Sequence, residues 1–236
     1  MDGNRSYSHG WTGEELKLPV SERELKFIAA GRRKARTDLL WLCKYVLGYD
    51  KINARVHGPM IEFLQKFEIQ GEDVVVDAAR GLFEYRPPTI DPVDTLKGGK
   101  KRRLLLAPRG WYKTSLNVIA HTIQFILNYP DITILIVHAS QEVAERMLVT
   151  IKDQFQRNSV MRYLFPEFCP PEKQKEWGTQ QFFNTPARKH WTTAPTVQVA
   201  GIETIRTGMH YHIVKFTDIV DEKNTMRKQL DAKIIY

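Results

Sequence analysis

Apolar and polar positions follow a helical spacing through the first third of the chain. Ser21-Glu-Arg-Glu has the spacing of a capping box, so we expect a helix to begin there. Two further stretches repeat apolar residues at three- and four-residue intervals, at about 37–47 and about 59–67. The pattern therefore predicts an N-terminal helical segment.

The pattern changes in the second half, where short apolar runs alternate with amphipathic stretches. This alternation is typical of a parallel α/β sheet. The expected order is a strand at 103–107, a helix at 113–128, a strand at 132–138, a helix at 141–157, short strands near 181–184 and 196–200, and a strand at 211–217.

Composition and these patterns together divide the 236 residues into four parts. With 42% hydrophobic residues the chain has enough apolar surface for a substantial core. The parts are a flexible polar arm at 1–20, the helical segment at 21–70, a Gly- and Pro-rich loop or insertion at 71–99, and an α/β core at 100–236.

The most informative motif begins at Leu104 and reads Leu-Leu-Leu-Ala-Pro-Arg-Gly-Trp-Tyr-Lys-Thr-Ser. An apolar run enters a tight turn, and Lys-Thr-Ser opens the next helix. Backbone amides at such a helix start bind phosphate, assisted by the helix dipole. Lys113 would reach the β- and γ-phosphates of a nucleotide, and the Thr114 hydroxyl would hold Mg²⁺.

The match to the Walker A pattern is incomplete. Gly110 is the single glycine of the turn, and Ala107 and Tyr112 stand where the pattern has glycines. A strand, turn and helix with a solvated lysine therefore remains an alternative interpretation of the segment.

Acidic residues follow the strand expected at 211–217. Asp218 comes directly after it, at the strand end where open α/β sheets bind ligands, and Asp221 and Glu222 follow within a turn. In phosphoryl transfer one such carboxylate orients Mg²⁺ and another polarises the attacking water. A solvated acidic loop is the alternative, and the motif does not assign the two roles.

These motifs resemble the N-terminal ATPase domain of the large terminase subunit of tailed bacteriophages, over residues from about 37 to 224. The segments that carry the resemblance are Asp38-Leu-Leu-Trp-Leu-Cys-Lys-Tyr-Val-Leu-Gly-Tyr, Val56-His-Gly-Pro-Met, Ala107-Pro-Arg-Gly-Trp-Tyr-Lys-Thr-Ser, Trp177 with Phe182-Phe183, Val197-Gln-Val-Ala-Gly and Arg206-Thr-Gly-Met-His-Tyr-His.

The resemblance implies an α/β P-loop NTPase of the ASCE type, with a central, mainly parallel sheet flanked by helices and an N-terminal helical segment. It implies an ATP hydrolase that uses ATP and Mg²⁺ to translocate double-stranded DNA into a procapsid. The implied partners are DNA, a portal protein and a small terminase subunit, with a homo-oligomeric ring assembled on the portal and no membrane. The implied location is the cytoplasm of an infected bacterial host, transiently at the procapsid portal.

The resemblance also assigns residues, and one departs from its pattern. Relatives usually carry two acidic residues at the strand end, whereas Thr217 occupies the first of these positions here. Arg206 is the candidate for an arginine finger that reaches a neighbouring subunit, and a surface arginine is its alternative. The implied nucleotide-binding set is Pro108, Arg109, Gly110, Trp111, Tyr112, Lys113, Thr114 and Ser115; the catalytic set is Asp218, Glu222 and Arg206; the metal set is Thr114, Asp218 and Asp221.

The charge balance leaves nucleic acid open as a partner. Lysine and arginine number 35 against 27 acidic residues, a net charge of +8. Weak candidates for DNA contact are Lys100, Lys101, Arg102, Arg103, Arg188 and Lys189, and the alternative is a set of solvated surface charges.

Hydrophobicity and cysteine content exclude two classes of protein. No apolar run has the length of a membrane span, and the two cysteines cannot form a disulfide framework. We expect an isolated motor domain that lacks the family's C-terminal nuclease domain. The rival hypotheses are another P-loop DNA translocase or helicase-like ATPase, and a nucleic-acid-binding module with a decayed nucleotide site.

Overall fold

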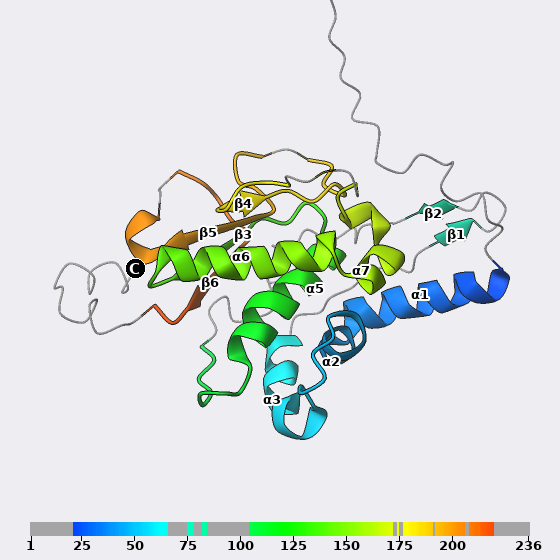
Figure 1. Cartoon of the computed structure of the whole chain (residues 1–236), viewed down its shortest axis with the longest axis horizontal. Helices are drawn as coiled ribbons and strands as arrows, with labels where there is room; N and C mark the ends of the chain where they lie inside the picture. Colours follow the sequence, from blue (N-terminus) through cyan, green and yellow to red (C-terminus); the bar gives the residue numbers. More distant parts are fainter. Residues whose placement is uncertain are drawn as a thin grey trace, which may run out of the picture.

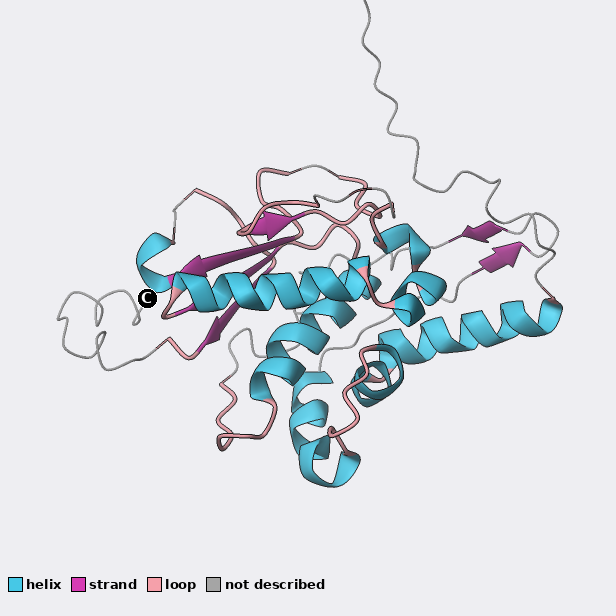
Figure 2. Ribbon diagram, viewed as in Figure 1, coloured by secondary structure: helices cyan, strands magenta, loops and turns pink. Residues whose placement is uncertain are grey.

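The protein, in a computed structural model, is an α/β fold with helices packed against a four-stranded mixed sheet (Figures 1 and 2). The structure describes residues 21–65, 75–77, 82–84, 104–171, 174, 177–190, 192–205 and 208–219. No helix in these ranges combines the length and apolar character that crossing a bilayer requires.

Three parallel strands form the centre of the sheet. Strand β3 (Ile134–His138) pairs with β5 (Val197–Gly201) on one side and with β6 (Ile213–Thr217) on the other. The short strand β4 (Phe182–Phe183) adds to β5 in the antiparallel direction, which gives the order β4-β5-β3-β6. The strands expected at 132–138, near 181–184 and 196–200, and at 211–217 are thus confirmed within two residues at each end.

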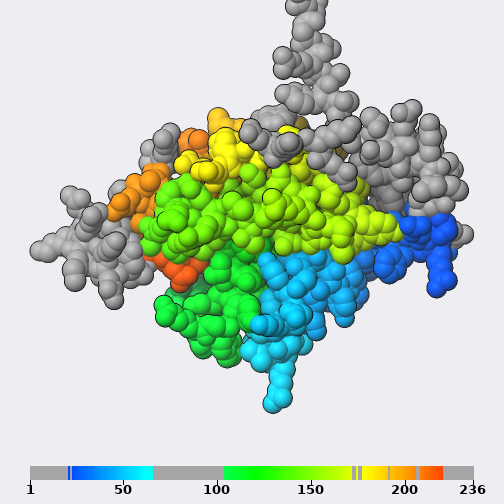
Figure 3. Space-filling model, viewed as in Figure 1, coloured from blue at the N-terminus to red at the C-terminus, as the bar shows by residue number. Residues whose placement is uncertain are grey.

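One face of this sheet is covered by helices. Helix α6 (Gln141–Gln156) packs on β3 and β5, and it lies across the front of the molecule in Figure 3. The π-helix η2 (Thr114–Ala120), continued by α5 (His121–Asn128), packs beside it and contacts β6. The helices expected at 113–128 and 141–157 are confirmed, although the first begins as a π-helix.

The other face of β6 is open in the part of the chain that the structure describes. Side chains alternate between the two faces of a strand, so Val214 and Phe216 share one face and Lys215 points to the other. Val214 and Phe216 are 44% and 56% exposed, whereas Lys215 is buried beneath the helices. The larger hydrophobic cluster therefore lies on the helix side of the sheet, and a smaller one, formed by Leu135, Val137, Ala200 and Ile202, lies apart from it.

The N-terminal helices pack onto this same core. Ser21 caps α1 (Glu22–Thr37) by accepting a hydrogen bond from the Glu24 amide at 3.2 Å, which confirms the helix start expected there. The Glu24 carboxylate accepts a hydrogen bond from the Tyr163 hydroxyl at 2.8 Å and so ties this helix to its neighbour. The other elements of this region are α2 (Leu39–Trp41), the π-helix η1 (Leu42–Val46), α3 (Ala54–Gln65), α7 (Ser159–Leu164) and the 3₁₀ turn η3 (Pro166–Phe168).

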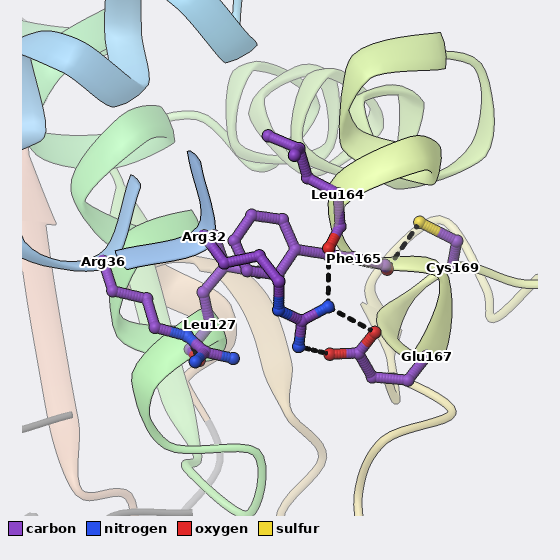
Figure 4. A network of polar contacts seen from close by, with 7 residues as sticks. All are labelled: Arg32, Arg36, Leu127, Leu164, Phe165, Glu167 and Cys169. Atoms are coloured by element: carbon purple, nitrogen blue, oxygen red, sulfur yellow. Dashed lines mark hydrogen bonds and ion pairs between the residues drawn. The ribbon is translucent and has the colours of Figure 1, made fainter. Parts of the chain in front are cut away.

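A buried arginine joins α1 to α7 and η3 (Figure 4). The Arg32 guanidinium donates to the Leu164 carbonyl at 2.6 Å, forms a two-pronged ion pair with Glu167, and lies over the Phe165 ring at 4.8 Å. One turn on, Arg36 donates from Nε to the Leu127 carbonyl at the end of α5. The helical segment and the sheet therefore share one core.

Two predicted elements differ from the structure. The strand expected at 103–107 is absent over the described residues 104–107, because Leu104 and Leu106 are 77% and 83% exposed and neither gains the burial that an apolar strand needs. Helix α3 begins at Ala54, five residues before the expected start, because the Asn53 side chain accepts a hydrogen bond from the Val56 amide and caps it there.

The region expected to be irregular at 71–99 contains two short strands. These are β1 (Val75–Asp77) and β2 (Leu82–Glu84), which pair antiparallel with each other. A further 3₁₀ turn, η4 (Ile202–Thr204), follows β5.

Candidate nucleotide-binding site

The predicted phosphate loop is a turn that leads into the helix η2. Gly110 has φ +81° and Tyr112 has φ +50°, so both lie in the left-handed region, and Lys113 is helical at φ −50° and ψ −50°. A bulky residue in that region stores backbone strain, of a kind that recurs at ligand-binding turns. Tyr112 thus adopts the conformation for which the Walker A pattern has glycine.

Solvent exposure decreases along this loop, from the turn into the helix. Pro108, Arg109 and Gly110 are exposed, and Trp111 and Tyr112 are 40% and 38% exposed. The three residues that follow, Lys113, Thr114 and Ser115, are half-buried. All eight predicted nucleotide-binding residues therefore form one continuous segment that remains accessible to solvent.

The side chain of His57 supports the loop from helix α3. Its ring lies 5.8 Å from that of Tyr112 and 6.5 Å from that of Trp111, both in edge-on arrangements. His57 is buried, and its Nδ1 accepts a hydrogen bond from the Asn53 amide at 3.1 Å. Sequence reasoning did not identify this contact, because the histidine and the loop are more than fifty positions apart.

The acidic strand end lies at the carboxyl edge of the parallel strands. Asp218 follows β6 with φ +45°, and its carbonyl accepts a hydrogen bond from the Ala139 amide, just after β3, at 3.3 Å. Its carboxylate accepts a hydrogen bond of 3.4 Å from the Thr217 hydroxyl. The neutral Thr217 thus bonds the carboxylate in the place where relatives of the resembled family carry a second acid.

A polar network that the sequence did not indicate occupies the same edge. The Gln141 side-chain carbonyl accepts hydrogen bonds from the Gly201 amide at 2.6 Å and the Thr204 hydroxyl at 2.8 Å. Its amide group donates to Glu145 at 2.8 Å. Gln141 therefore fixes the carboxyl ends of β3 and β5 relative to each other.

A hydrogen bond connects the phosphate-loop helix to the acid-ended strand. The Lys215 ammonium, three residues before Asp218, donates to the backbone carbonyl of Asn117, four residues after Lys113, at 2.5 Å. Residues of η2 also lie close to residues of β6. The two predicted halves of the site are thus held by neighbouring elements.

Within the described residues, no group of three or more His, Cys, Asp or Glu side chains is assembled for a metal ion. Thr114 and Asp218 supply a hydroxyl and a carboxylate, which are the hard oxygen ligands that Mg²⁺ prefers. The other predicted site residues, Asp221, Glu222, Arg206 and the basic run Lys100, Lys101, Arg102 and Arg103, lie outside the described residues.

The two described candidates for DNA contact differ in their environment. Arg188 is 5% exposed, and its guanidinium donates to Asn184, Thr192 and the carbonyls of His190 and Ala194. These bonds hold its own loop together and leave little of the side chain exposed, and DNA contact through Arg188 stays a prediction. Lys189 is exposed, and its amide donates to the Asp131 carboxylate at 2.7 Å.

A shallow cavity of about 280 Å³ lies elsewhere on the molecule, between α6 and residues 177–180. Its lining includes Val149, Lys152 and Trp177 and none of the predicted site residues. It therefore adds nothing to the candidate nucleotide site.

Comparison of the chain with known protein families and with curated proteins gave no match.

Proposed function

We propose that this chain is the ATPase motor domain of a viral DNA-packaging terminase, which hydrolyses ATP to translocate double-stranded DNA into a procapsid. The proposal takes the fold to be a P-loop NTPase of the ASCE type. The observation that supports it best is the Lys215–Asn117 hydrogen bond, which joins the helix after the phosphate loop to the strand that ends in Asp218. That strand, β6, runs parallel to β3, which in turn runs parallel to β5, and this arrangement agrees with the proposal.

In this function the loop binds the triphosphate of ATP. The Lys113 ammonium bonds the β- and γ-phosphates and stabilises the negative charge that develops as water attacks the γ-phosphorus atom. The Thr114 hydroxyl and the Asp218 carboxylate would hold Mg²⁺, which neutralises phosphate charge when bound. In this assignment Asp221 or Glu222 polarises the attacking water, and Arg206 serves the site of a neighbouring subunit.

DNA, a portal protein and a small terminase subunit are the partners of this proposal, with the subunits in a ring on the portal. Contacts from Lys189 and the basic run at 100–103 would go to backbone phosphates. Such contacts make DNA affinity fall steeply with salt and ignore base sequence. This is the behaviour that movement along arbitrary DNA requires.

A second candidate function is a nucleic-acid-binding module that no longer hydrolyses ATP. Two observations favour it: Tyr112 carries backbone strain where the phosphate-binding pattern has glycine, and the neutral Thr217 bonds the Asp218 carboxylate. DNA binding would then persist, and replacing Lys113 would not change it.

Equilibrium binding of MgATP to the whole chain tests the proposal without requiring an assembled ring. We expect Lys113→Ala to weaken binding by about tenfold to a hundredfold, since a charged hydrogen bond contributes about 1.5–3 kcal/mol. The matched control is Lys152→Ala on α6, whose ammonium donates to the Thr179 carbonyl at 3.1 Å, outside the loop.

Equal MgATP affinity in the wild type, Lys113→Ala and Lys152→Ala would overturn the motor proposal. If DNA binding then remained intact and salt-dependent, the second candidate function would take its place. Loss of binding in Lys113→Ala alone, together with turnover of ATP by the wild type, supports the motor.

A further inference from the structure

Lys215 is a buried cation in an unusual place. It lies in the middle of β6, on the face that η2 and α5 cover, and it is 7% exposed. Its ammonium donates to the Asn117 carbonyl and lies 5.6 Å from the centre of the Phe125 ring. Among the side chains that the structure describes, no carboxylate forms an ion pair with it. Burial lowers the pKa of Lys215 well below its ordinary value.

The carbonyl that Lys215 binds belongs to a break in helical hydrogen bonding. The His121 amide donates to the carbonyl of Leu116, five residues back, as in a π-helix. Helix α5, which starts at His121, has the ordinary spacing of four. Where a spacing of five changes to four, one carbonyl loses its amide donor, and counting on from Leu116 makes it that of Asn117.

The π-helix determines which way the start of the helix faces. It holds one more residue per hydrogen-bonded ring than an α-helix, so removing it would rotate the residues before it by about 100°, the angle of one residue. Lys113 directly precedes the π-helix, and Thr114 is its first residue. A group that stabilises the π-helix therefore fixes their direction relative to β6 and Asp218.

We propose that Lys215 is a positioning residue: by donating to the Asn117 carbonyl it maintains the π-helix and thereby aims Lys113 and Thr114 at the end of β6. The effect on nucleotide binding rests on the proposed function, whereas the effect on the helix does not. The two effects can be measured separately.

Lys215→Met is the central variant, because methionine preserves chain length and apolar volume while removing the donor and the charge. Amide hydrogen exchange over residues 112–128 reports the helix. We expect exchange there to accelerate at least severalfold in Lys215→Met and to remain at the wild-type rate in Lys152→Met, the matched control. Lys215→Arg retains a donor and a charge and should exchange more slowly than Lys215→Met.

The MgATP affinity of the same proteins reports whether Lys113 and Thr114 still face the end of β6. We expect about a tenfold loss in Lys215→Met, partial rescue in Lys215→Arg and no change in Lys152→Met. Unchanged exchange in a folded Lys215→Met protein would overturn the proposal, and so would accelerated exchange with unchanged affinity. If the wild type bound no MgATP, the proposed function would fail, and the exchange data alone would decide whether Lys215 maintains the π-helix.

If Lys215→Met does not fold, Lys215→Leu takes its place. Leucine has a similar volume and no hydrogen-bond donor, so the expected results are the same. Exchange of residues 141–156 in α6 serves as the internal reference in the Lys215 variants, since Lys215 forms no described bond to that helix.

Discussion

Two buried cations, Arg32 and Lys215, differ in the contacts that surround them. Arg32 lies where α1 meets α7 and η3, and its guanidinium is matched by a carboxylate, a carbonyl and an aromatic face. Lys215 lies between the sheet and η2, where its described contacts are one carbonyl and one aromatic ring. Both side chains are nearly excluded from water, so both incur a large desolvation cost.

This difference in contacts indicates different roles: Arg32 joins helices and stabilises the fold, whereas Lys215 positions the residues of the candidate site. The planar fork of Arg32 suits Glu167, and this pair recovers part of the desolvation cost by bidentate bonding. Lys215 has no such compensation among the described residues, so its burial is explained by the one carbonyl that it supplies with a donor. We therefore expect loss of the arginine contacts to affect stability first, and loss of the lysine contact to affect the site first.

Removing the carboxylate at the arginine joint should have the largest effect on stability. Glu167→Ala leaves the buried Arg32 guanidinium without its counter-ion, and we expect the free energy of unfolding to fall by about 3 kcal/mol. Urea denaturation measures it. The control is Glu142→Ala, which removes an exposed carboxylate bonded to Arg146 and should change stability by less than about 0.5 kcal/mol. Similar losses in the two variants would show that the joint is no stronger than a surface pair.

Replacing each cation by methionine sharpens the comparison. Arg32→Met leaves the Leu164 carbonyl and Glu167 without their donor, and we expect a loss of about 2 kcal/mol. Lys215→Met removes an uncompensated charge, so we expect a change within about 1 kcal/mol in either direction. Urea denaturation of both variants measures the difference. A larger loss in Lys215→Met than in Arg32→Met would reverse the assignment of roles.

Cysteine reactivity provides a local measure of the arginine joint. Burial raises the pKa of Cys43 and of Cys169 to about 12, so both thiols should resist alkylation at pH 8 in the folded protein. The Cys169 thiol donates to the Phe165 carbonyl inside the joint, as Figure 4 shows. Glu167→Ala should therefore speed alkylation of Cys169 severalfold more than that of Cys43, measured by mass spectrometry after timed labelling. Equal acceleration of both thiols would indicate global unfolding rather than local opening.

The sheet was predictable from the sequence because its central strands are local apolar runs. Ile134–His138 and Val197–Gly201 are buried along most of their length, so hydrophobicity alone locates them. The run at 104–107 is equally apolar, yet no strand of the described residues pairs with it. Hydrophobicity shows which segments favour burial but does not supply the partner that completes a ladder.

The candidate site residues come from two separate local motifs. Lys113 and Thr114 belong to one, Asp218 belongs to the other, and their joint role stays a prediction. Lys215 follows from neither motif, because alternation along β6 predicts that Val214 and Phe216 are buried and the lysine exposed, and the structure shows the reverse. The carbonyl that attracts the lysine arises from a π-helix nearly a hundred positions earlier, and a pattern within one strand cannot report it.

The surface pair of Asp131 and His190 is expected to have the smallest effect on the free energy of unfolding, so it is the reference for the buried Arg32–Glu167 pair. The Asp131 carboxylate accepts hydrogen bonds from the amides of Lys189 and His190 and from the His190 ring, at 2.7–2.8 Å. Partial burial alone would raise the pKa of Asp131, but these hydrogen bonds outweigh it and hold the pKa below its ordinary value.

Because folding lowers the pKa of Asp131, its stabilising contribution is fully present above the unfolded-state pKa of about 3.9 and disappears as the pH falls through the folded-state value. Asp131→Asn lacks that dependence. Urea denaturation at pH 5 and pH 3 should therefore show the wild type losing more stability on acidification than the variant. We expect a difference below about 1 kcal/mol, because the pair is largely solvated and surface ion pairs contribute little. A difference as large as the Glu167→Ala loss would mean that exposure does not weaken the pair, and burial would then be no reason to expect a larger contribution from the Arg32–Glu167 pair.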